Sequence, residues 1–349
     1  AHHQRSGNQP VMTTRIQSQE GITLVVQSFG RWNEYRRAML CVLSYAAVTG
    51  GRVNDVILFT DRPDVFADAF ADRPVRYVLL TPEKIRSMRG QIDFLHRMKI
   101  ALIEEAFGMT ERPLLYVDSD AFFLKDLTPR VVGLSDAEAL MHVREYEFGS
   151  LRNMPLPAGK PFRAFVELID SHAFDVPSGT MRVSPEWSSW NAGIMAFHPS
   201  HRGLLAEVYQ LTDQFFVPTG NHASEQYAFS IVLQNHTRIQ PCDDAIYHYW
   251  YRVQKQVVDE LLERELTFEV MKGSLQERIG VVKNWISGLP ALLERHPAII
   301  RDRAIQSLHE NQWRKGFGLG LRYLSGKPND GTFVRDMLYH LRRMLFNIN

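Results

Sequence analysis

The sequence predicts an α/β protein built on a twisted, mostly parallel sheet that is flanked by helices and followed by a helical carboxyl-terminal region. Two observations support this fold class. Apolar strand-like segments alternate with helical segments from Ile22 to Val117, and helical periodicity with few strand signals continues after Trp250. Alternating strands and helices favour a parallel sheet, because each connection must return the chain to the same edge of the sheet.

The amino-terminal half supplies the predicted sheet. The segment from Ile22 to Phe29 is almost continuously apolar, as expected for a strand that is covered on both faces. Further strands are predicted at 55–59, 75–80 and 113–117, with helices at 33–48 and 93–107. In sheets of this kind, ligands bind at the carboxyl ends of the strands. We therefore expect the binding site near the residues that follow these strands.

The rest of the chain gives more helices than strands. Strands are predicted at 140–144 and 193–197, and helices at 206–216, 225–233, 257–266, 275–282 and 333–345. The stretch 153–185 contains Pro and Gly and is left open as loop, helix or insertion. We divide the chain into a lead of residues 1–20, a catalytic domain of residues 21–255 and a helical region of residues 256–349. The lead is polar with paired histidines, which is typical of a tag.

Charge and composition exclude several classes of protein. The 349 residues include 40 Lys and Arg and 39 Asp and Glu, so no strong field favours binding to nucleic acid. Cys41 and Cys242 form no C-x-x-C pattern, which argues against a zinc site and a disulfide framework. No segment reaches the roughly 18 apolar residues of a membrane span. We expect a cytoplasmic protein.

A pair of carboxylates follows the strand at 113–117 directly. Asp118 and Asp120 flank Ser119, and the apolar stretch 121–124 comes next, so the polar group interrupts a buried segment. In extended backbone, residues two apart point to the same side, roughly 6.5 to 7 Å apart at Cα. Both carboxylates could therefore bind one divalent cation such as Mn²⁺ or Mg²⁺. A D-x-D string by itself is common, and an isolated one is more often a solvated turn or a helix cap.

Four segments together resemble a known family. Leu114-Leu115-Tyr116-Val117-Asp118-Ser119-Asp120 resembles the "YLDSD" signature of the GT-A glycosyltransferases, and especially of glycosyltransferase family 8. Trp190 to Met195 resembles the family's "FNAGVM" strand, Glu225-Gln226 stands where the family usually has Asp-Gln, and Tyr247-His248-Tyr249 resembles its "HF" element. Tyr251 and Lys255 are approximate counterparts of the Gly and Lys that usually follow this His.

The resemblance implies a retaining, metal-dependent transfer of a sugar from a nucleotide diphosphate donor, with a UDP-sugar expected. Asp118, Asp120 and His248 would bind the metal. Donor contacts are expected from Ser119, Asn191, Gly193, Lys255, Arg97 and Lys99, and catalytic roles from Gln226 and Glu225. Gly193 would leave room for the sugar. From topology alone, Ser28, Phe29 and Asp61 would lie near the base and ribose.

Several alternatives remain open at this stage. Arg97 and Lys99 are two residues apart on a predicted helix and do not share a face, so both could be solvated charges. His198, His222 and His236 compete with His248 as metal ligands. A metal-dependent phosphodiesterase or pyrophosphohydrolase also needs clustered carboxylates, and a non-catalytic nucleotide-sugar-binding module is a third reading. If the reaction inverts the sugar, Glu225 or Glu186 would act as general base.

The acceptor and the carboxyl-terminal helix are less defined. A glycan, a lipid-linked saccharide or a protein could receive the sugar. The segment from Arg335 to Phe346 predicts an amphipathic helix with Met337, Leu338, Leu341, Met344 and Leu345 on its apolar side. Such a helix packs on its own domain more often than on lipid, and peripheral contact with the inner face of a membrane is kept as the alternative.

Overall fold

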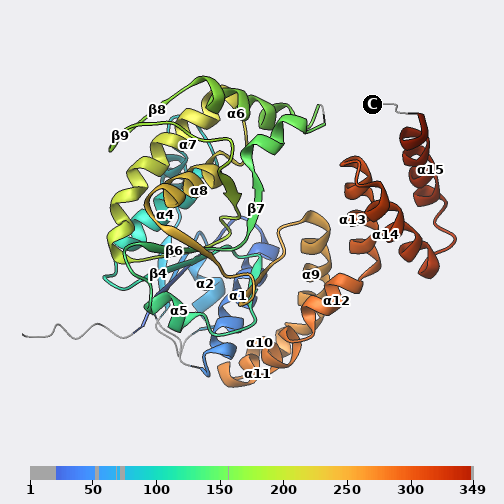
Figure 1. The fold of residues 1–349 in the computed structure, drawn as a ribbon. Helices are drawn as coiled ribbons and strands as arrows, with labels where there is room; N and C mark the ends of the chain where they lie inside the picture. Colours follow the sequence, from blue (N-terminus) through green and yellow to red (C-terminus); the bar gives the residue numbers. More distant parts are fainter. Residues whose placement is uncertain (1–20, 52–54, 68, 71–74, 156, 347–349) are drawn as a thin grey trace, which may run out of the picture.

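The computed structural model describes residues 21–51, 55–67, 69–70, 75–155 and 157–346. The predicted lead, residues 1–20, lies outside the described residues. A seven-stranded sheet forms the centre of the molecule (Figure 1). Its strands are β1 (Thr23–Ser28), β2 (Asp55–Thr60), β3 (Val75–Leu79), β4 (Leu114–Val117), β6 (Glu138–Met141), β11 (Ile194–Phe197) and β12 (Arg238–Pro241).

The sheet is mostly parallel. The strand order is β12-β6-β11-β4-β1-β2-β3, and β11 is antiparallel to both of its neighbours, β4 and β6. The other neighbouring strands pair in parallel. The predicted fold class, a mostly parallel sheet flanked by helices with a helical carboxyl-terminal region, is therefore confirmed.

Two apolar cores cover the two faces of the sheet, and alternate residues of β1 show the division. Leu24 and Val26 belong to one core together with α1 (Trp32–Val48), whereas Val25 belongs to the other. The first core also takes side chains from α9 (Arg252–Glu265), α11 (Leu275–Ile286) and α12 (Leu289–Arg295). The second takes them from α4 (Arg97–Phe107), α7 (Leu205–Thr219) and α8 (Ser224–His236). Every residue of β1 except Gln27 is buried, as the apolar pattern predicted.

Short strands and helices complete the domain around this sheet. Three small two-stranded sheets pair β5 (Ala121–Phe123) with β13 (Ile246–His248), β7 (Arg144–Glu147) with β10 (Ser188–Trp190), and β8 (Phe174–Val176) with β9 (Gly179–Met181). The remaining helices before α9 are α2 (Pro63–Ala67), α3 (Pro82–Arg89), α5 (Thr128–Val132), η1 (Phe148–Asn153), α6 (Lys160–Ser171) and η2 (Pro199–Leu204). The strand predicted at 140–144 is thus two strands in different sheets, and the stretch left open at 153–185 contains α6, β8 and β9.

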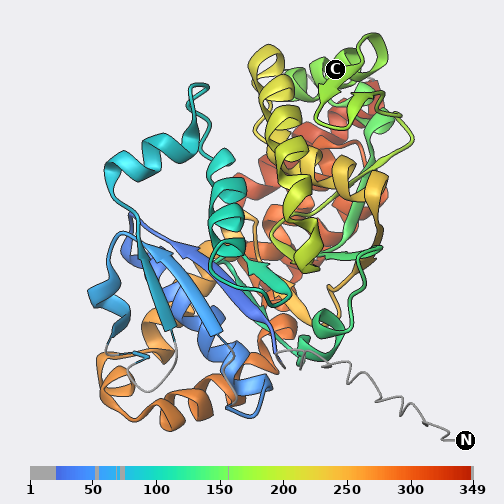
Figure 2. The same ribbon diagram turned by 90° about the vertical axis from the view of Figure 1, so that its left-hand side faces the viewer.

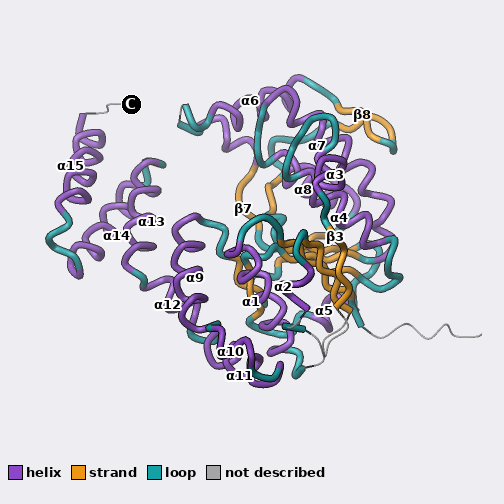
Figure 3. The backbone as a smooth tube through the Cα atoms, turned by 180° about the vertical axis from the view of Figure 1, so that it is seen from behind, coloured by secondary structure: helices purple, strands orange, loops and turns teal. Residues whose placement is uncertain are grey.

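The chain after Arg252 is helical throughout its described part. It adds α10 (Phe268–Lys272), α13 (Pro297–His309), α14 (Trp313–Gly326) and α15 (Gly331–Phe346) to α9, α11 and α12. In Figures 1 and 2 the orange helices α10 and α11 run beneath α1, and Figure 3 shows the later helices as a purple arm beside the strands. The arm has a small core of its own, formed by Ala304, Leu308, Phe333 and Met337. None of the described helices has both the length and the apolar character needed to cross a membrane.

Candidate active site

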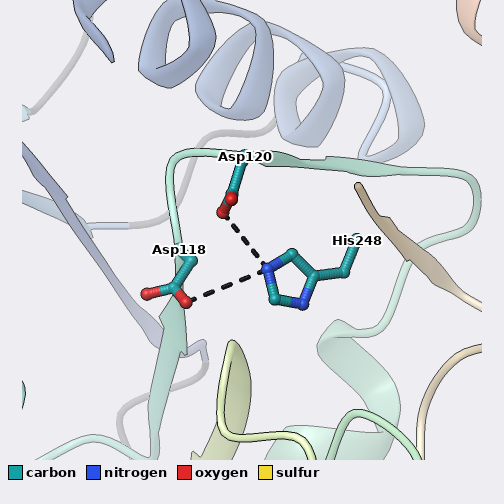
Figure 4. Close-up of side chains that lie close together, drawn as sticks. All are labelled: Asp118, Asp120 and His248. Atoms are coloured by element: carbon teal, nitrogen blue, oxygen red, sulfur yellow. Dashed lines mark hydrogen bonds and ion pairs between the residues drawn. The ribbon is translucent and has the colours of Figure 1, made fainter. Parts of the chain in front are cut away.

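Asp118, Asp120 and His248 converge at the carboxyl end of β4 (Figure 4). Asp118 directly follows β4, and its backbone N–H donates to Gly193 O at 2.7 Å. Asp120 precedes β5, which pairs with β13 so that His248 lies opposite Ala121. One ligand atom from each of the three side chains lies within 4.8 Å of the others. Strand pairing therefore brings a residue 128 positions away in sequence against the carboxylate pair.

The hydrogen bonds of His248 fix the orientation of its ring. The Asn191 amide nitrogen donates to Glu145 Oε1 at 3.3 Å, so its carbonyl oxygen, Oδ1, faces His248 Nδ1 at 2.9 Å. Nδ1 then carries a proton, so Nε2 is the nitrogen that faces the carboxylates; it donates to them when both ring nitrogens are protonated and offers a lone pair when the ring is neutral. Nε2 lies 3.2 Å from Asp120 Oδ1 and 3.9 Å from Asp118 Oδ2. With a neutral ring, Nε2 and the two facing carboxylate oxygens form a set of three ligand atoms that a divalent cation could join.

The donor set suits a divalent cation. Two carboxylates and one neutral imidazole match the ligand preference of Mn²⁺, and the carboxylates match that of Mg²⁺. Lys255 Nζ lies 2.5 Å from Asp120 Oδ2, on the side of the carboxylate away from His248. Burial works to raise the pKa of Asp120, but His248 and Lys255 outweigh it and hold that pKa well below its usual range. Asp120 is thus ionised and available as a ligand.

Asp118 is oriented by a tyrosine. The Tyr116 hydroxyl donates to Asp118 Oδ1 at 2.6 Å and accepts from Gln27 Nε2 at 2.8 Å. Tyr116 is fully buried in β4. Asp118 Oδ1 is thereby held on the sheet side, and Oδ2 is the oxygen that faces His248.

Gly193 leaves room for His248. A Cβ atom placed on Gly193 would overlap the imidazole ring of His248. The backbone carbonyl of the same residue binds Asp118 N, so the chain cannot easily move away. The sequence analysis expects Gly193 to leave room for the donor sugar; in the structure the group against this glycine is the His248 ring.

Lys99 and Glu225 form a buried pair behind Asp118. Lys99 Nζ lies 3.4 Å from both Asp118 Oδ2 and Glu225 Oε1, and it donates to Ala192 O at 3.1 Å. Burial raises the pKa of Glu225 to about 7; the Lys99 ammonium opposes this shift and the charge of Asp118 adds to it. Burial also works to lower the pKa of Lys99, but the carboxylates of Asp118 and Glu225 outweigh it and leave the pKa raised. Lys99 therefore remains a cation beside the triad.

Arg97 lies elsewhere. Its guanidinium makes two hydrogen bonds to Asp213 on α7, at 2.8 and 3.3 Å, and lies 4.6 Å above the centre of the Tyr209 ring. Arg97 and Lys99 are two residues apart on α4, and their side chains point to different sides of the helix, as helix geometry requires. The position of Arg97 gives no support to its predicted contact with the donor.

A cavity of about 520 Å³ adjoins the triad at the ends of β1 and α4. This volume lies in the range of small-molecule sites. Of the predicted donor contacts, five line the cavity: Ser28, Phe29, Lys99, Ser119 and Lys255. Asp61 does not line it and instead shapes its wall, since it accepts from Gly30 N at 3.1 Å and from the Tyr35 hydroxyl at 2.8 Å.

A charged network ties α9 to the cavity. Arg37 on α1 makes a two-fold hydrogen bond to Asp259, at 2.7 and 2.6 Å, and a third to Glu34 at 2.7 Å. Glu34 Oε2 in turn accepts from the Ser119 hydroxyl at 3.2 Å. Asp259 lies one helical turn after Lys255 on α9. The network thus places Lys255 over Asp120, although the two segments are far apart in the chain.

Glu145 is a residue that the sequence analysis missed. Its Oε1 accepts from Asn191 Nδ2 at 3.3 Å, and its Oε2 accepts from Gln226 Nε2 at 2.8 Å and from the Ser189 hydroxyl at 3.1 Å. Gln226 Oε1 also accepts from Ala192 N at 3.3 Å. Gln226 therefore positions Glu145 and the Asn191-Ala192-Gly193 loop. No motif includes Glu145, which lies on β7 within a pattern of alternating charged and aromatic residues.

Comparisons with known proteins give no family assignment from sequence. No protein-family model matches the chain, and no curated protein matches it. Among solved structures, it is similar to a galactosyltransferase LgtC in complex with donor and acceptor sugar analogues, with 11% identity over 75% of this chain and 95% of that one and a TM-score of 0.43. It is also similar to the glycosyltransferase GlyE of Streptococcus pneumoniae TIGR4, with 11% identity over 79% of this chain and 72% of that one and a TM-score of 0.41. Mouse xyloside xylosyltransferase 1 shows 10% identity over 63% of this chain and 84% of its own, with a TM-score of 0.40. At these TM-scores the likeness does not assign an activity, so the function is argued from the site.

Proposed function

We propose that this chain is a GT-A-type glycosyltransferase that moves a sugar from a nucleotide diphosphate donor, a UDP-sugar, to an acceptor hydroxyl. The observation that carries the proposal is the convergence of Asp118, Asp120 and His248 beside a cavity of about 520 Å³ that Ser119, between the two aspartates, helps to line. Two cationic side chains, Lys99 and Lys255, line the same cavity. A diphosphate is the ligand class that a carboxylate-bound cation and two ammonium groups would bind together.

In this proposal Asp118, Asp120 and His248 hold Mn²⁺ or Mg²⁺, which would neutralise charge on the diphosphate. Lys255 and Lys99 add fixed positive charge beside the departing phosphate. Asn191, Gln226 and Glu145 form the polar group next to the triad, which we assign to the sugar. The bond from the anomeric carbon to the phosphate oxygen breaks, and a bond to the acceptor oxygen forms. The proton of the acceptor hydroxyl leaves with the nucleoside diphosphate.

Retention of the anomeric configuration is the course that we propose. An inverting enzyme needs a general base that contacts the acceptor hydroxyl. Glu225 is 3% exposed and its carboxylate faces Lys99, so it is poorly placed for that role. Glu145 accepts hydrogen bonds from three donors, Asn191, Gln226 and Ser189, which fix its carboxylate. This arrangement supports stabilisation of a cationic sugar more than deprotonation of an acceptor.

The test is a screen of nucleotide sugars with Mn²⁺ or Mg²⁺ and a panel of acceptors. We expect one donor to raise the melting temperature in a metal-dependent way, since a ligand that binds the folded state stabilises it by mass action. That donor should then support acceptor-dependent transfer. Cleavage within the diphosphate itself, independent of any acceptor, would refute the proposal and favour a pyrophosphohydrolase. Tight donor binding without turnover, unchanged in Asp120→Ala, would favour a binding module.

The geometry already weighs against the hydrolase. Enzymes that cleave phosphodiesters with two metals need ligands for ions roughly 3.5 to 4 Å apart. Within the part of the chain that the structure describes, Asp118, Asp120 and His248 are the one group of three or more side chains placed to hold an ion. A single three-ligand site would suit one cation that neutralises charge on a bound diphosphate.

A further inference from the structure

A second cavity, of about 880 Å³, lies between the catalytic domain and the helical arm. One wall comes from Met154 and Pro155, which follow η1, and from Arg163 on α6. The other wall comes from the end of α13 and from α15, with Glu310, Tyr339 and Arg343. Figure 1 shows α13 to α15 facing this part of the domain. We call this cavity the arm groove.

Tyr251 relates the arm groove to the candidate active site. Trp250 lies between the two rings, with its centre 5.0 Å from that of His248 and 5.0 Å from that of Tyr251. Burial raises the pKa of the Tyr251 phenol, and the charges of Glu145 and Glu310 both add to the shift. Glu145 belongs to the active site and Glu310 to the groove, so Tyr251 lies within electrostatic reach of both. It is 41% exposed and can contact a ligand that runs from one to the other.

Two guanidinium groups face the arm groove without an acidic partner. Arg163 Nε donates to Met154 O at 2.7 Å. Arg343 donates to Asn311 Oδ1 at 3.1 Å and lies 5.5 Å above the Trp313 ring. Neither arginine forms an ion pair with a carboxylate of the described residues. The one carboxylate that lines the groove, Glu310, accepts from Gln312 Nε2 at 2.8 Å.

The groove also offers surfaces that suit sugar rings. Tyr339 is 60% exposed, and an exposed aromatic face packs well on the apolar C–H face of a sugar. Asn311, Glu310 and His309 supply hydrogen-bonding groups for hydroxyls. Arg163 and Arg343, which have no carboxylate partner among the described residues, would each bind a carboxylate or a phosphate in a bidentate way, through two N–H groups.

We propose that the arm groove binds the acceptor, and that this acceptor is an oligosaccharide carrying an anionic group, either a carboxylate or a phosphate. The inference rests on the proposed glycosyl transfer and adds the acceptor class to it. The acceptor chain lies along the groove, passes Tyr251 and presents its terminal hydroxyl at Glu145. Arg163 and Arg343 hold the anionic group away from the reacting end.

The experiment measures transfer to immobilised glycans of one to four sugars, each in neutral, uronic acid and phosphorylated forms, with the donor found in the nucleotide-sugar screen. Variants are Arg163→Gln, Arg343→Gln and Ala158→Trp, the last of which fills the groove. Arg322→Gln and Arg335→Gln, at exposed positions of α14 and α15 outside the groove, are the matched controls. Acceptor-independent donor hydrolysis and the melting temperature are measured for every variant.

Wild-type protein should prefer anionic glycans of two or more sugars. A comparison of the uronic acid glycans with the phosphorylated glycans shows which anion is bound. Each Arg→Gln variant should lower kcat/KM for these glycans by roughly tenfold or more, because one charge-assisted contact is lost. Donor hydrolysis should stay within about twofold of wild type, since no altered residue touches the triad. The control variants should match wild type.

Three results would overturn the inference while leaving the proposed function intact. They are equal transfer to neutral and anionic glycans, equal transfer by wild type and all three groove variants, and donor hydrolysis with transfer to no glycan at all. Absence of both donor hydrolysis and transfer to any acceptor in wild type has a different meaning, because it rejects the proposed function itself. If Arg343→Gln lowers the melting temperature strongly, Arg163→Gln and Ala158→Trp decide the outcome.

Discussion

The metal-ligand group and the arm groove differ in how their side chains are held in place. Around Asp118, Asp120 and His248, strand pairing sets the backbone, and a neighbouring hydrogen bond or ion pair orients each of the three side chains. In the arm groove, one wall comes from helices that pack on a core of a few residues, the other includes the loop before α6, and several lining side chains are exposed. The first region is built for fixed geometry and the second for recognition of a flexible chain. Substitutions should therefore affect chemistry in the first and acceptor choice in the second.

The largest expected effect comes from Asp120→Asn. The amide keeps the shape of the side chain but removes a charged metal ligand, so kcat for transfer should fall on the order of a thousandfold. Steady-state transfer at saturating Mn²⁺ measures the change. The exposed Asp136→Asn serves as the control and should behave as wild type. A loss of less than tenfold would mean that Asp120 is not a metal ligand.

Gly193→Ala tests whether the geometry of the triad is fixed. The added methyl group would overlap the His248 ring, so the ring must turn or the backbone must shift. We expect a loss of roughly 10- to 100-fold in metal affinity and a decrease of about 1–3 kcal/mol in the free energy of unfolding. Calorimetric titration with Mn²⁺ and urea unfolding measure the two effects. Unchanged metal affinity would show that His248 moves freely.

Glu225→Gln tests the buried pair behind the triad through its pH dependence. The folded-state pKa of Glu225 is about 7 against an ordinary value of 4.5, so the folded protein binds the extra proton between these values. The contribution of this proton to the free energy of unfolding is complete below pH 4.5 and is lost as the pH rises through 7. The loss amounts to at most about 3 kcal/mol of unfolding free energy.

Urea unfolding of wild type and Glu225→Gln at pH 5 and pH 8, without metal or donor, checks this sign. Wild type should lose more stability than the variant on going to pH 8. If the free energy of unfolding changed equally in the two proteins between pH 5 and pH 8, Glu225 would not be a buried carboxyl with a raised pKa. Glu186→Gln, at an exposed position, controls for the substitution itself.

The smallest effect is expected from Gly320→Ala in the arm, which makes the same change as Gly193→Ala in the other region. The new methyl group would overlap the end of the Met337 side chain, which can rotate away. Alanine in a helix interior gains about 1 kcal/mol over glycine, which offsets the repacking. The free energy of unfolding should change by less than about 1 kcal/mol, and donor hydrolysis should be unaltered. A loss as large as that of Gly193→Ala would remove the contrast between the regions.

Much of the sheet could be predicted from the sequence because its strands are buried on both faces. The apolar segments at 22–29, 55–59 and 113–117 match β1, β2 and β4 closely. The helix predicted from Asp93 begins at Arg97, since Asp93 has a positive φ of 51° that an α-helix excludes. The helix α14 was missed because Gly316, Gly318 and Gly320 interrupt its apolar pattern, and glycine is a weak helix former; α13 was also not predicted.

The candidate site was predictable where chemistry and strand position coincide. Asp118 and Asp120 were found because two carboxylates interrupt an apolar segment at a strand end. The separate directions of Arg97 and Lys99 were not predictable, because the choice depends on which partner, Asp213 or Asp118, lies beside α4. Glu145 was not predictable either, since its partners Ser189, Asn191 and Gln226 come from β10, the loop after it and α8, more than 40 residues away.

By itself, the sequence determined the mostly parallel sheet and the polar Asp118-Ser119-Asp120 group at the end of a buried strand, because apolar periodicity and strand direction are local properties of the chain. The tertiary structure decided that His248 faces the two carboxylates, that Gly193 leaves room for its ring and that Lys255 lies over Asp120. Those contacts join residues more than 50 positions apart, and pairing between strands and packing of α9 on α1 bring them together. The tertiary structure also formed the arm groove, whose two walls lie about 150 residues apart in the chain and meet through the packing of the arm beside the domain.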